Sequence, residues 1–272
     1  MRQNYRFELL CPPQTHGNQL FARLRADQDL YRRHLKSLQQ LRGSAYLKDG
    51  AIQACELDED GCFRMRGDEQ SWHLLLTDDH SNVIGCARYL VHPNTVSFDN
   101  LRVSHCALAK DPQYGEKVRQ AVEADLEIAR RQGLTYVEIG GWALAEEWRG
   151  TKAALEILAG SYALAHLWGG SLGACTATVR HGSSSMLRRI GGSSLEMNGE
   201  ALPAYEDPHY GCAMELLRFD YRTYAARYAP VVEQVKKKIA DAGVITPTPH
   251  RPRWLRFAHV AEPVAVPYRK CA

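Results

Sequence analysis

A stretch that is apolar on nearly every face of a helix stands in the middle of the chain and constrains its fold more than any other feature. Within residues 149–168 apolar side chains stand on nearly every face of a helix, and Glu156 is the only acid in this range. Such a helix must be buried. It lies between two apolar runs typical of strands, residues 134–139 and 172–179. A strand, a buried helix and a second strand form a parallel crossover, so the sequence predicts an α/β fold.

The first of these strands continues through a double glycine into a further apolar run. Gly140-Gly141 interrupt the strand, and Trp142-Ala143-Leu144 extend it. Glycine inside a strand costs stability, so the pair indicates a β-bulge or a place where another molecule approaches the backbone closely.

The helix that follows begins with Arg149-Gly150-Thr151-Lys152. The first turn of a helix exposes unpaired N–H groups and the positive end of the helix dipole, an arrangement that binds pyrophosphate. A phosphate-bearing ligand is one interpretation. The other is an ordinary surface helix start with two solvated cations, and spacing alone does not decide between them.

Further elements surround this unit. The patterns predict one or two amphipathic helices over residues 19–41, a loop over 46–66, a β-hairpin over 72–90, a helix from Asp111-Pro112 to Gly133, a short helix capped by Ser183, a strand over 212–217, and a helix over 221–239 with a kink at Pro230. We expect residues 1–220 to form the main domain. Residues 221–272 are expected to add a C-terminal helix and a basic, proline-rich tail packed on that domain.

Composition excludes several classes of protein. The chain has 34 Lys and Arg against 31 Asp and Glu, and the net charge of +3 is too small to indicate a nucleic-acid partner. No apolar run approaches the roughly 18–20 residues that span a bilayer, and no signal peptide is evident, so we expect a cytoplasmic protein without a transmembrane segment. The eight cysteines include no C-x-x-C pair, so no metal site is expected.

The order of strand, double glycine and Arg-Gly helix start resembles the thioester-binding core of the GNAT acyltransferase superfamily, where a bulge parts two parallel strands to admit the pantetheine arm. Residues 138–144 and 148–150 are similar to a strand and loop of acyl-homoserine-lactone synthases, ornithine-lipid N-acyltransferases and N-acyl amino acid synthases. Upstream, Asp68, residues 72–76 and residues 85–88 resemble the same group. The resemblance implies a GNAT-like α/β (α+β) fold: a mixed central sheet with a splayed parallel strand pair and flanking helices.

The resemblance also implies an activity. It indicates an N-acyltransferase that moves an acyl group, expected to be long, from an acyl-carrier-protein or acyl-CoA thioester to the amine of an amino acid or similar small molecule. No permanently bound cofactor is expected, and an acyl-carrier protein is an expected partner. Two alternatives stay open: a short-chain, acetyl-CoA-dependent N-acetyltransferase, and a GNAT-like binding module that does not catalyse.

Candidate site residues follow from the same resemblance. Glu138 is the candidate base for the acceptor ammonium, directly or through a water, and its alternative is a structural partner of an arginine. The predicted donor-binding residues are Trp142, Ala143, Leu144, Arg149, Gly150, Thr151, Lys152, Ala153 and Ala154. The predicted acceptor-binding residues are Arg88 and Asp68; Arg88 either pairs with an acid such as Asp68 or binds the acceptor carboxylate in a fork.

Two positions depart from the family pattern. Lys152 replaces a second glycine of the phosphate loop, and Gly141 replaces an arginine after the glutamate. An ammonium group at Lys152 can bind a phosphate and offset the lost backbone approach. Loss of the arginine disfavours a close lactone synthase and favours an enzyme like the N-acyl amino acid synthases. Arg188-Arg189 could join Arg149 and Lys152 in a basic patch for phosphates or an acidic carrier protein.

Overall fold

The parallel crossover expected from the sequence forms the centre of the structure. The computed structural model describes residues 4–13, 21, 23–93 and 95–247. Strand β5 (Thr135–Leu144), helix α3 (Lys152–Leu167) and strand β6 (Ser171–Thr178) follow one another, and β5 pairs with β6 in parallel. The predicted strand, buried helix and strand are therefore confirmed.

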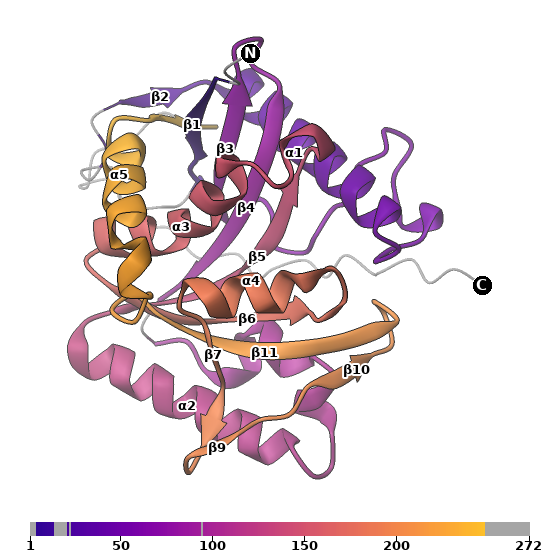
Figure 1. Ribbon diagram of the computed structural model, residues 1–272, viewed down its shortest axis with the longest axis vertical. Coiled ribbons are helices and arrows are strands. Elements are labelled where there is room, and N and C mark those ends of the chain that lie inside the picture. Colours follow the sequence, from indigo (N-terminus) through magenta and orange to yellow (C-terminus); the bar gives the residue numbers. More distant parts are fainter. Residues whose placement is uncertain (1–3, 14–20, 22, 94, 248–272) are drawn as a thin grey trace, which may run out of the picture.

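These two strands belong to a mixed sheet of ten strands. Its other members are β1 (Tyr5–Leu10), β2 (Leu24–Ala26), β3 (Trp72–Asp78), β4 (Val83–His92), β7 (Ser193–Ser194), β10 (Tyr205–Asp207), β11 (Cys212–Asp220) and β12 (Gly243–Thr246). The order is β10-β11-β6-β5-β4-β3-β1-β12-β2, with β7 paired to β11 (Figure 1). The pairs β5–β6, β1–β12 and β12–β2 are parallel. A separate hairpin joins β8 (Glu196–Met197) and β9 (Glu200–Ala201).

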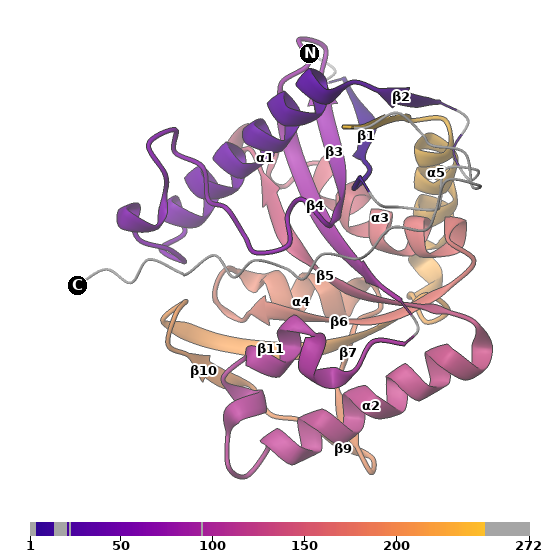
Figure 2. The ribbon, with the colours of Figure 1, turned by 180° about the vertical axis from the view of Figure 1, so that it is seen from behind.

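Helices cover both faces of the sheet. Helices α1 (Gln28–Lys48) and α2 (Gly115–Gln132) lie on one face, which Figure 2 shows in front. Helices α3, α4 (Ser183–Ile190) and α5 (Ala229–Ala240) lie on the other face, in front in Figure 1. Short 3₁₀ helices span Ala54–Glu56, Phe98–Asn100, Arg102–His105, Leu108–Lys110, Glu146–Trp148, Arg180–Gly182 and Ala226–Tyr228.

The hydrophobic core lies on both sides of the sheet. Leu74 and Leu164 are fully buried between β3 and α3. Val122 of α2 packs with Leu172 of β6 on the opposite face, and Leu38 of α1 fills a third cluster beside them. A strand that is covered on both faces must be apolar along its whole length, which explains the continuous hydrophobic runs of β3 and β6.

The expected start of the helix after Asp111 was wrong. Helix α2 begins at Gly115, and Asp111 does not cap it. The carboxylate of Asp111 accepts hydrogen bonds from the backbone N–H groups of Gln113 and Tyr114, at 2.8 and 3.0 Å. These bonds close a local turn, an alternative that Asp offers the backbone in place of a helix.

Three other helix starts also differ from expectation. Pro230 stands in the first turn of α5, where its missing N–H costs nothing, so it begins the helix instead of kinking it. Ser183 is the first residue of α4 and not its cap, because Gly182 occupies the N-cap position. Helix α1 is one continuous helix that begins and ends later than the stretch predicted for residues 19–41.

The sequence did not predict β1, β2 or β12. Strand β12 pairs with β1 on one side and β2 on the other, so a segment close to the end of the described chain completes the edge of the main sheet. Helix α5 packs on α3, as Figure 1 shows. The division of the chain at residue 220 stays a prediction, and the tail beyond residue 247 lies outside the described residues.

Candidate functional site

The double glycine forms a β-bulge in β5. Against β4, Ala143 pairs with Cys86 and Gly140 pairs with Arg88, so β5 holds one residue more than its partner between these pairs. Gly141 has a positive φ of 63°. A Cβ atom there would lie 3.1 Å from Cβ of Arg88, which leaves room only for glycine. The predicted bulge is therefore confirmed.

Strand β5 parts from β6 just before the bulge. The parallel pairing runs from Thr135 with Ser171 to Glu138 with Ala174. Beyond that point β5 stays paired with β4 as far as Leu144, and β6 stays paired with β11. The two parallel strands thus diverge while each remains held by its outer neighbour, which is the splayed pair that the resemblance implied. We call the space between them the gap.

The backbone of the bulged segment presents polar groups to the gap. The N–H of Ala145 donates to the carbonyl of Ile84 on β4, at 2.8 Å. Alternate residues of a strand direct their backbone groups to opposite edges, so Ala143 also faces β4, whereas Trp142 and Leu144 face the gap. Of the predicted donor-binding residues in β5, two therefore present N–H groups to the gap and Ala143 does not.

The first turn of α3 lies at the end of the same segment. Thr151 caps the helix: its hydroxyl oxygen accepts the N–H of Ala153 at 3.2 Å, and its carbonyl accepts the N–H of Ala154 at 3.2 Å. Gly150 has a positive φ of 72°, and nothing lies within 4 Å of where its Cβ would be. The loop before the helix is therefore open to an approaching group.

The two cations of this loop are paired with acids. Arg149 forms an ion pair with Asp49 at 3.1 Å, and Lys152 one with Glu156 at 2.8 Å. Glu156 is fully buried and also accepts a hydrogen bond from Lys238 of α5 at 2.8 Å. Burial alone would raise the pKa of Glu156, but hydrogen bonds from the two lysines and from a tyrosine outweigh it and lower that pKa. A phosphate at this loop would have to compete with these carboxylates.

Asp68 lies in a buried charged cluster on the α1 side of the bulge. Its carboxylate accepts hydrogen bonds from Arg42 at 3.2 Å and from Gln39 and the N–H of Met65 at 3.0 Å each. Arg88 is 3.6 Å from Asp68 and also donates to a backbone carbonyl at 3.0 Å. Burial alone would raise the pKa of Asp68, yet the Arg42 guanidinium and the hydrogen bonds lower it. The structure thus brings the two predicted acceptor-binding residues together.

This cluster carries an excess of positive charge. The imidazole of His73 contacts the Asp68 carbonyl at 2.7 Å, and burial lowers the pKa of His73 to about 4, so this ring is neutral at pH 7. Two guanidinium groups therefore face one carboxylate. Within the described part of the chain, the buried Nε atoms of Arg42 and Arg88 have no hydrogen-bond partner. The site of a Cβ on Gly141 lies 3.2 Å from Arg42, which places the cluster against the bulge.

The sequence did not single out Arg42 or Gln39. Both stand in α1 among many other polar residues, and their spacing carries no motif. Only the partial apolar stripe of the helix hints that Gln39 and Arg42 face inward, because Leu38 precedes them and Ala45 follows one turn later. The fold, not a local pattern, brings them to Asp68.

Glu138 is held by three donors where the strands part. Its carboxylate accepts the backbone N–H of Val103 at 2.8 Å, the N–H of Arg102 at 3.0 Å and a contact from His92 at 2.9 Å. The side chain is buried. Glu138 therefore anchors the 3₁₀ segment after β4 to the sheet, and its structural partners are backbone groups and a histidine, not the arginine side chain considered from the sequence.

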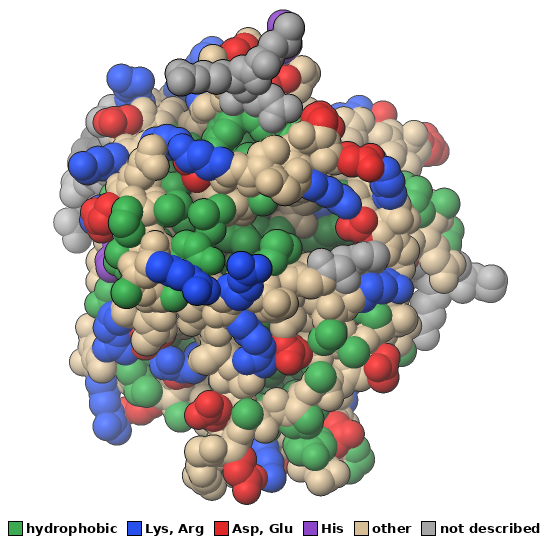
Figure 3. Space-filling model, in the orientation of Figure 1, with side chains coloured by type: hydrophobic (Ala, Val, Ile, Leu, Met, Phe, Trp, Pro, Cys, Tyr) green, Lys and Arg blue, Asp and Glu red, His purple; other side chains and the backbone are tan. Residues whose placement is uncertain are grey.

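An apolar surface borders the gap on the face that carries α3 and α4. Figure 3 shows hydrophobic side chains gathered in a hollow on this face, with Lys and Arg on both sides of it. Val179, directly after β6, and Met186 of α4 are 46% and 44% exposed. Hydrophobic side chains this exposed are suited to contact an apolar ligand or partner.

The basic patch expected around the gap is largely neutralised. Arg188 of α4 forms an ion pair with Glu215 at 3.0 Å, as Arg149 and Lys152 pair with other acids. Arg189 is exposed. The local excess of positive charge on this side is therefore smaller than the count of cationic side chains suggests.

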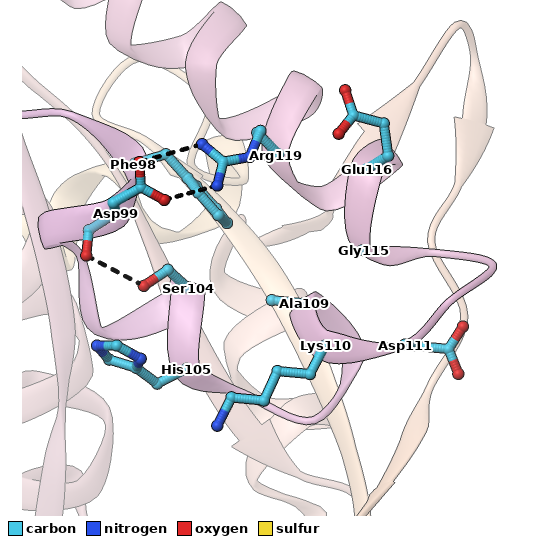
Figure 4. A pocket seen from close by; sticks show the side chains of 10 residues that line it. All are labelled: Phe98, Asp99, Ser104, His105, Ala109, Lys110, Asp111, Gly115, Glu116 and Arg119. Carbon is cyan, nitrogen blue, oxygen red and sulfur yellow. Dashed lines mark hydrogen bonds and ion pairs between the residues drawn. The ribbon is translucent and has the colours of Figure 1, made fainter.

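A second hollow lies on the α2 side, away from the gap. It has a volume of about 490 Å³ and lies between α2 and the 3₁₀ segments before it (Figure 4). Arg119 and Asp99, which both line it, form an ion pair at 2.6 Å, and His105 and Lys110 also line it. None of the residues predicted for the site lines it.

The described residues contain neither a metal site nor a membrane-spanning helix. Among them, no cluster of His, Cys, Asp or Glu side chains could hold a metal ion. No helix in the described part of the chain is long and apolar enough to span a membrane.

The fold of this chain, with a bulged strand that parts from its parallel neighbour beside a helix N-terminus, is shared by solved structures of acyl-homoserine lactone synthases and of an N-acyl amino acid synthase. The solved structure of BjaI, a CoA-dependent acyl-homoserine lactone synthase with SAM and isopentyl-CoA, is similar with a TM-score of 0.54 at 13% identity. The similarity covers 91% of this chain and 96% of BjaI.

Two further solved structures have the same fold. MesI, also a CoA-dependent acyl-homoserine lactone synthase, gives a TM-score of 0.51 at 16% identity over 89% of this chain and 98% of its own. FeeM, an N-acyl amino acid synthase from uncultured soil microbes, gives 0.50 at 9% identity over 82% and 93%. No protein-family model matches the sequence, and no curated protein matches it. At these identities the likeness establishes the fold.

Proposed function

We propose that the protein is an N-acyltransferase that moves an acyl group from an acyl-carrier-protein or acyl-CoA thioester to the amine of an amino acid or a similar small molecule. The observation that carries this proposal is the gap: β5 and β6 cease pairing after Glu138 and Ala174, although both strands continue. A parted strand pair leaves backbone groups unpaired inside the molecule, and a ligand with amide groups satisfies them.

The donor is proposed to lie along β5. Its pantetheine amides pair with the backbone of Trp142 and Leu144, and its phosphates reach the first turn of α3 around Gly150, where the helix dipole favours negative charge. Lys152 supplies a cation there if the phosphate displaces it from Glu156. BjaI, whose fold is shared, was solved with isopentyl-CoA, which supports a thioester donor.

The acceptor is proposed to bind on the α1 side of the bulge. The cluster of Arg42, Asp68 and Arg88 has one positive charge in excess, and both arginines have unpartnered Nε atoms. A carboxylate bound there would neutralise the excess charge and accept charge-assisted hydrogen bonds. Amino acids carry a carboxylate next to the amine, so this cluster favours them over simple alkylamines.

The reaction needs positioning more than special groups. The amine nitrogen forms a bond to the thioester carbonyl carbon, the carbon–sulfur bond breaks, and the thiol leaves with a proton. The N–H groups facing the gap stabilise the oxygen that gains charge. The ammonium must first lose a proton, and we assign this to Glu138 acting through a water, since Oε1 accepts one hydrogen bond and has capacity for another.

The acyl chain is proposed to occupy the apolar hollow of Figure 3. Val179 and Met186 are hydrophobic side chains that would lose contact with water on binding a chain. Each methylene buried contributes roughly 0.8 kcal/mol, so the preference for long chains would be steep.

The direct test offers the purified protein acyl-CoA and acyl-carrier-protein donors of two to sixteen carbons with a mixture of amino acids. Mass spectrometry should find N-acyl amino acids and consumption of the donor thioester. Arg88→Met should raise KM for the acceptor and leave KM for the donor unchanged, whereas Arg66→Met, which changes an exposed side chain nearby, should leave both unchanged. Turnover of acetyl-CoA alone would favour a short-chain acetyltransferase, and no turnover of any donor would overturn the proposal.

A binding module without catalysis is the second candidate. It is favoured by the geometry of Glu138, whose carboxylate already accepts three hydrogen bonds, and by the pairing of Arg149 and Lys152 with acids. Such a module would bind a thioester or coenzyme A and leave it intact. Calorimetric binding of coenzyme A without any product in the turnover assay would select this candidate.

A further inference from the structure

The sheet face that carries α1 and α2 has an open surface beside Glu138. Side chains alternate along a strand, so Glu138 and Gly140 of β5 face the same side as Tyr136, which packs with α2 (Figure 2). Nothing lies within 4 Å of where a Cβ atom of Gly140 would be. Gly140 pairs with Arg88 of β4, whose side chain reaches Asp68 on this face. We call the surface formed by Glu138, Gly140 and Arg88 the floor.

A third arginine borders the floor on the side away from β4. Arg102 begins the 3₁₀ turn Arg102–His105, and Val103 of this turn packs into the core formed by α2 and β6. The backbone N–H of Arg102 donates to Glu138 at 3.0 Å. The side chain of Arg102 is half-buried, and its buried Nη1 atom has no hydrogen-bond partner among the described residues. This guanidinium is therefore placed beside Glu138 with a donor to spare.

Tyr46 of α1 indicates the direction in which Arg102 points. Burial raises the pKa of Tyr46, and the positive charges of Arg42 and Arg102 act against that rise. Charges interact in this way only over short distances, so both guanidinium groups lie near the same phenol. Arg102 thus extends toward α1, across the face that holds the floor.

The cations around the floor outnumber the acids. Arg42 and Arg88 share the carboxylate of Asp68. The carboxylate of Glu138 accepts backbone N–H groups and pairs with His92. Neither carboxylate pairs with the guanidinium of Arg102. A buried cationic donor without an acceptor costs free energy that a bound anion recovers.

We infer that Arg102 binds a second anionic group of the acceptor, so that the acceptor is an amino acid with an acidic side chain. This inference rests on the proposed function, because it takes the carboxylate next to the amine to bind at Arg42 and Arg88. Arg102 lies on the other side of the floor and takes the side-chain anion, while the amine lies between them beside Glu138. A guanidinium binds carboxylate and phosphate groups in the same forked geometry, so the side chain carries one of these two groups.

The first test compares acceptors that differ in the charge of the side chain. Wild-type protein receives one acyl-CoA donor with glutamate or glutamine, aspartate or asparagine, and O-phosphoserine or serine. The charged member of a preferred pair should have a KM roughly ten- to a hundredfold lower, the range expected from a hydrogen bond between charged groups. A preference confined to O-phosphoserine assigns a phosphate, and one confined to glutamate or aspartate assigns a carboxylate. Turnover with equal KM values within all three pairs would overturn the inference and leave the proposed function standing.

The second test removes the guanidinium and keeps the backbone N–H that holds Glu138. Arg102→Met should raise KM for the charged acceptor roughly ten- to a hundredfold and KM for its neutral counterpart far less. KM for the donor should stay as in wild type. Lys110→Met, which removes an exposed cation further along the same segment, should keep the wild-type preference. An equal rise of KM for both members of the pair in Arg102→Met would show a structural role only and overturn the inference.

Calorimetry supplies a readout that does not depend on turnover. Glutamate, aspartate or O-phosphoserine should bind wild type more tightly than its neutral counterpart, and Arg102→Met should lose that difference. Such binding without transfer from any donor would overturn the proposed reaction and retain the anion site at Arg102. Equal binding of charged and neutral amino acids would overturn the anion site.

Discussion

Buried ionisable side chains divide into two kinds in this molecule. Glu138 and Glu156 are each surrounded by donors, which suits a fixed carboxylate. Arg42 and Arg88 are surrounded by too few acceptors and share one carboxylate of Asp68. A buried group whose partners are complete stabilises the fold, whereas one whose partners are incomplete costs free energy unless a ligand completes them.

His73 makes stability depend on pH. Burial lowers its pKa from 6.5 to about 4, so the unfolded chain takes up a proton in this range that the folded chain does not. Stability contributed by the neutral ring is complete above pH 6.5 and is lost as the pH falls toward 4, by an amount on the order of 3 kcal/mol. The free energy of unfolding in urea, measured at pH 7 and at pH 4.5, should fall less between these two pH values in His73→Gln than in wild type.

His80→Gln is the matched control for this experiment, because His80 is exposed in the turn between β3 and β4. It should keep the pH dependence of the wild type. Equal pH dependence in His73→Gln and wild type would show that His73 is not the group responsible.

Glu138→Gln separates the structural role of this residue from the proposed chemical one. The amide places N–H donors where the carboxylate accepts backbone N–H groups, and leaving one of these unpaired costs about 1–3 kcal/mol of unfolding free energy. Glu147→Gln, an exposed glutamate, should cost nothing measurable. Full stability of Glu138→Gln in urea unfolding would contradict the anchoring role, and lost turnover in that stable variant would then point to proton transfer alone.

At the scale of elements, the bulge in β5 is the feature on which the gap depends. It shifts the register against β4 by one residue. The alternation of side chains between the two faces of the sheet therefore changes phase between Ile139 and Trp142. Both remain in the core on the α3 side, although they are three positions apart. Without the extra residue, one of them would point to α1.

Gly141→Ala should be costly and Gly140→Ala should not. Gly141 has a positive φ, and an added Cβ would lie 3.1 Å from Arg88, whereas nothing lies within 4 Å of the corresponding position on Gly140. We expect Gly141→Ala to lose about 1–3 kcal/mol in chemical denaturation and to weaken coenzyme A binding. Gly140→Ala should lose at most about 1 kcal/mol. Similar losses in both variants would show that the bulge does not require its glycine.

The sequence indicated some elements and not others for identifiable reasons. Helix α3 and strands β5 and β6 were predictable because their burial on all sides leaves long apolar runs, and the bulge because two glycines interrupt one of them. Strand β1 could have been predicted, since Arg6 and Glu8, which form an ion pair at 3.2 Å, alternate with its apolar residues as in a half-buried strand. Strands β2 and β12 are short and form only because the fold brings β12 to β1 and β2 to β12.

The candidate site was also predictable only in part. Its backbone part, from the double glycine to the first turn of α3, is continuous in sequence and was indicated by local patterns. Its charged part was indicated only at Asp68 and Arg88, because Arg42 reaches them from α1 through the tertiary fold. Of the partners that neutralise Arg149 and Lys152, Asp49 could not be foreseen because it belongs to a distant segment, whereas Glu156 stands four residues after Lys152 on the same helix, a spacing at which opposite charges pair.

At the scale of the whole molecule, each of the two parted strands is held by its outer neighbour. Strand β4 pairs with β5 along the full length of the divergence, and β11 does the same for β6. Helices α3 and α4 flank the divergence on one face, and α1 lies on the other. A sheet of ten strands therefore accommodates two unpaired edges in its interior, which ordinary folds avoid because buried backbone groups require partners.

The central claim is that this gap seats the flexible arm of a thioester donor. Its most direct test is a crystal structure of the protein with an acyl-CoA analogue in which a thioether replaces the thioester, so that no transfer occurs. The account predicts that the pantetheine amides bond to the backbone of Trp142 or Leu144 and that the phosphates contact the loop at Gly150. An analogue bound elsewhere, with β5 and β6 paired across an empty gap, would contradict it.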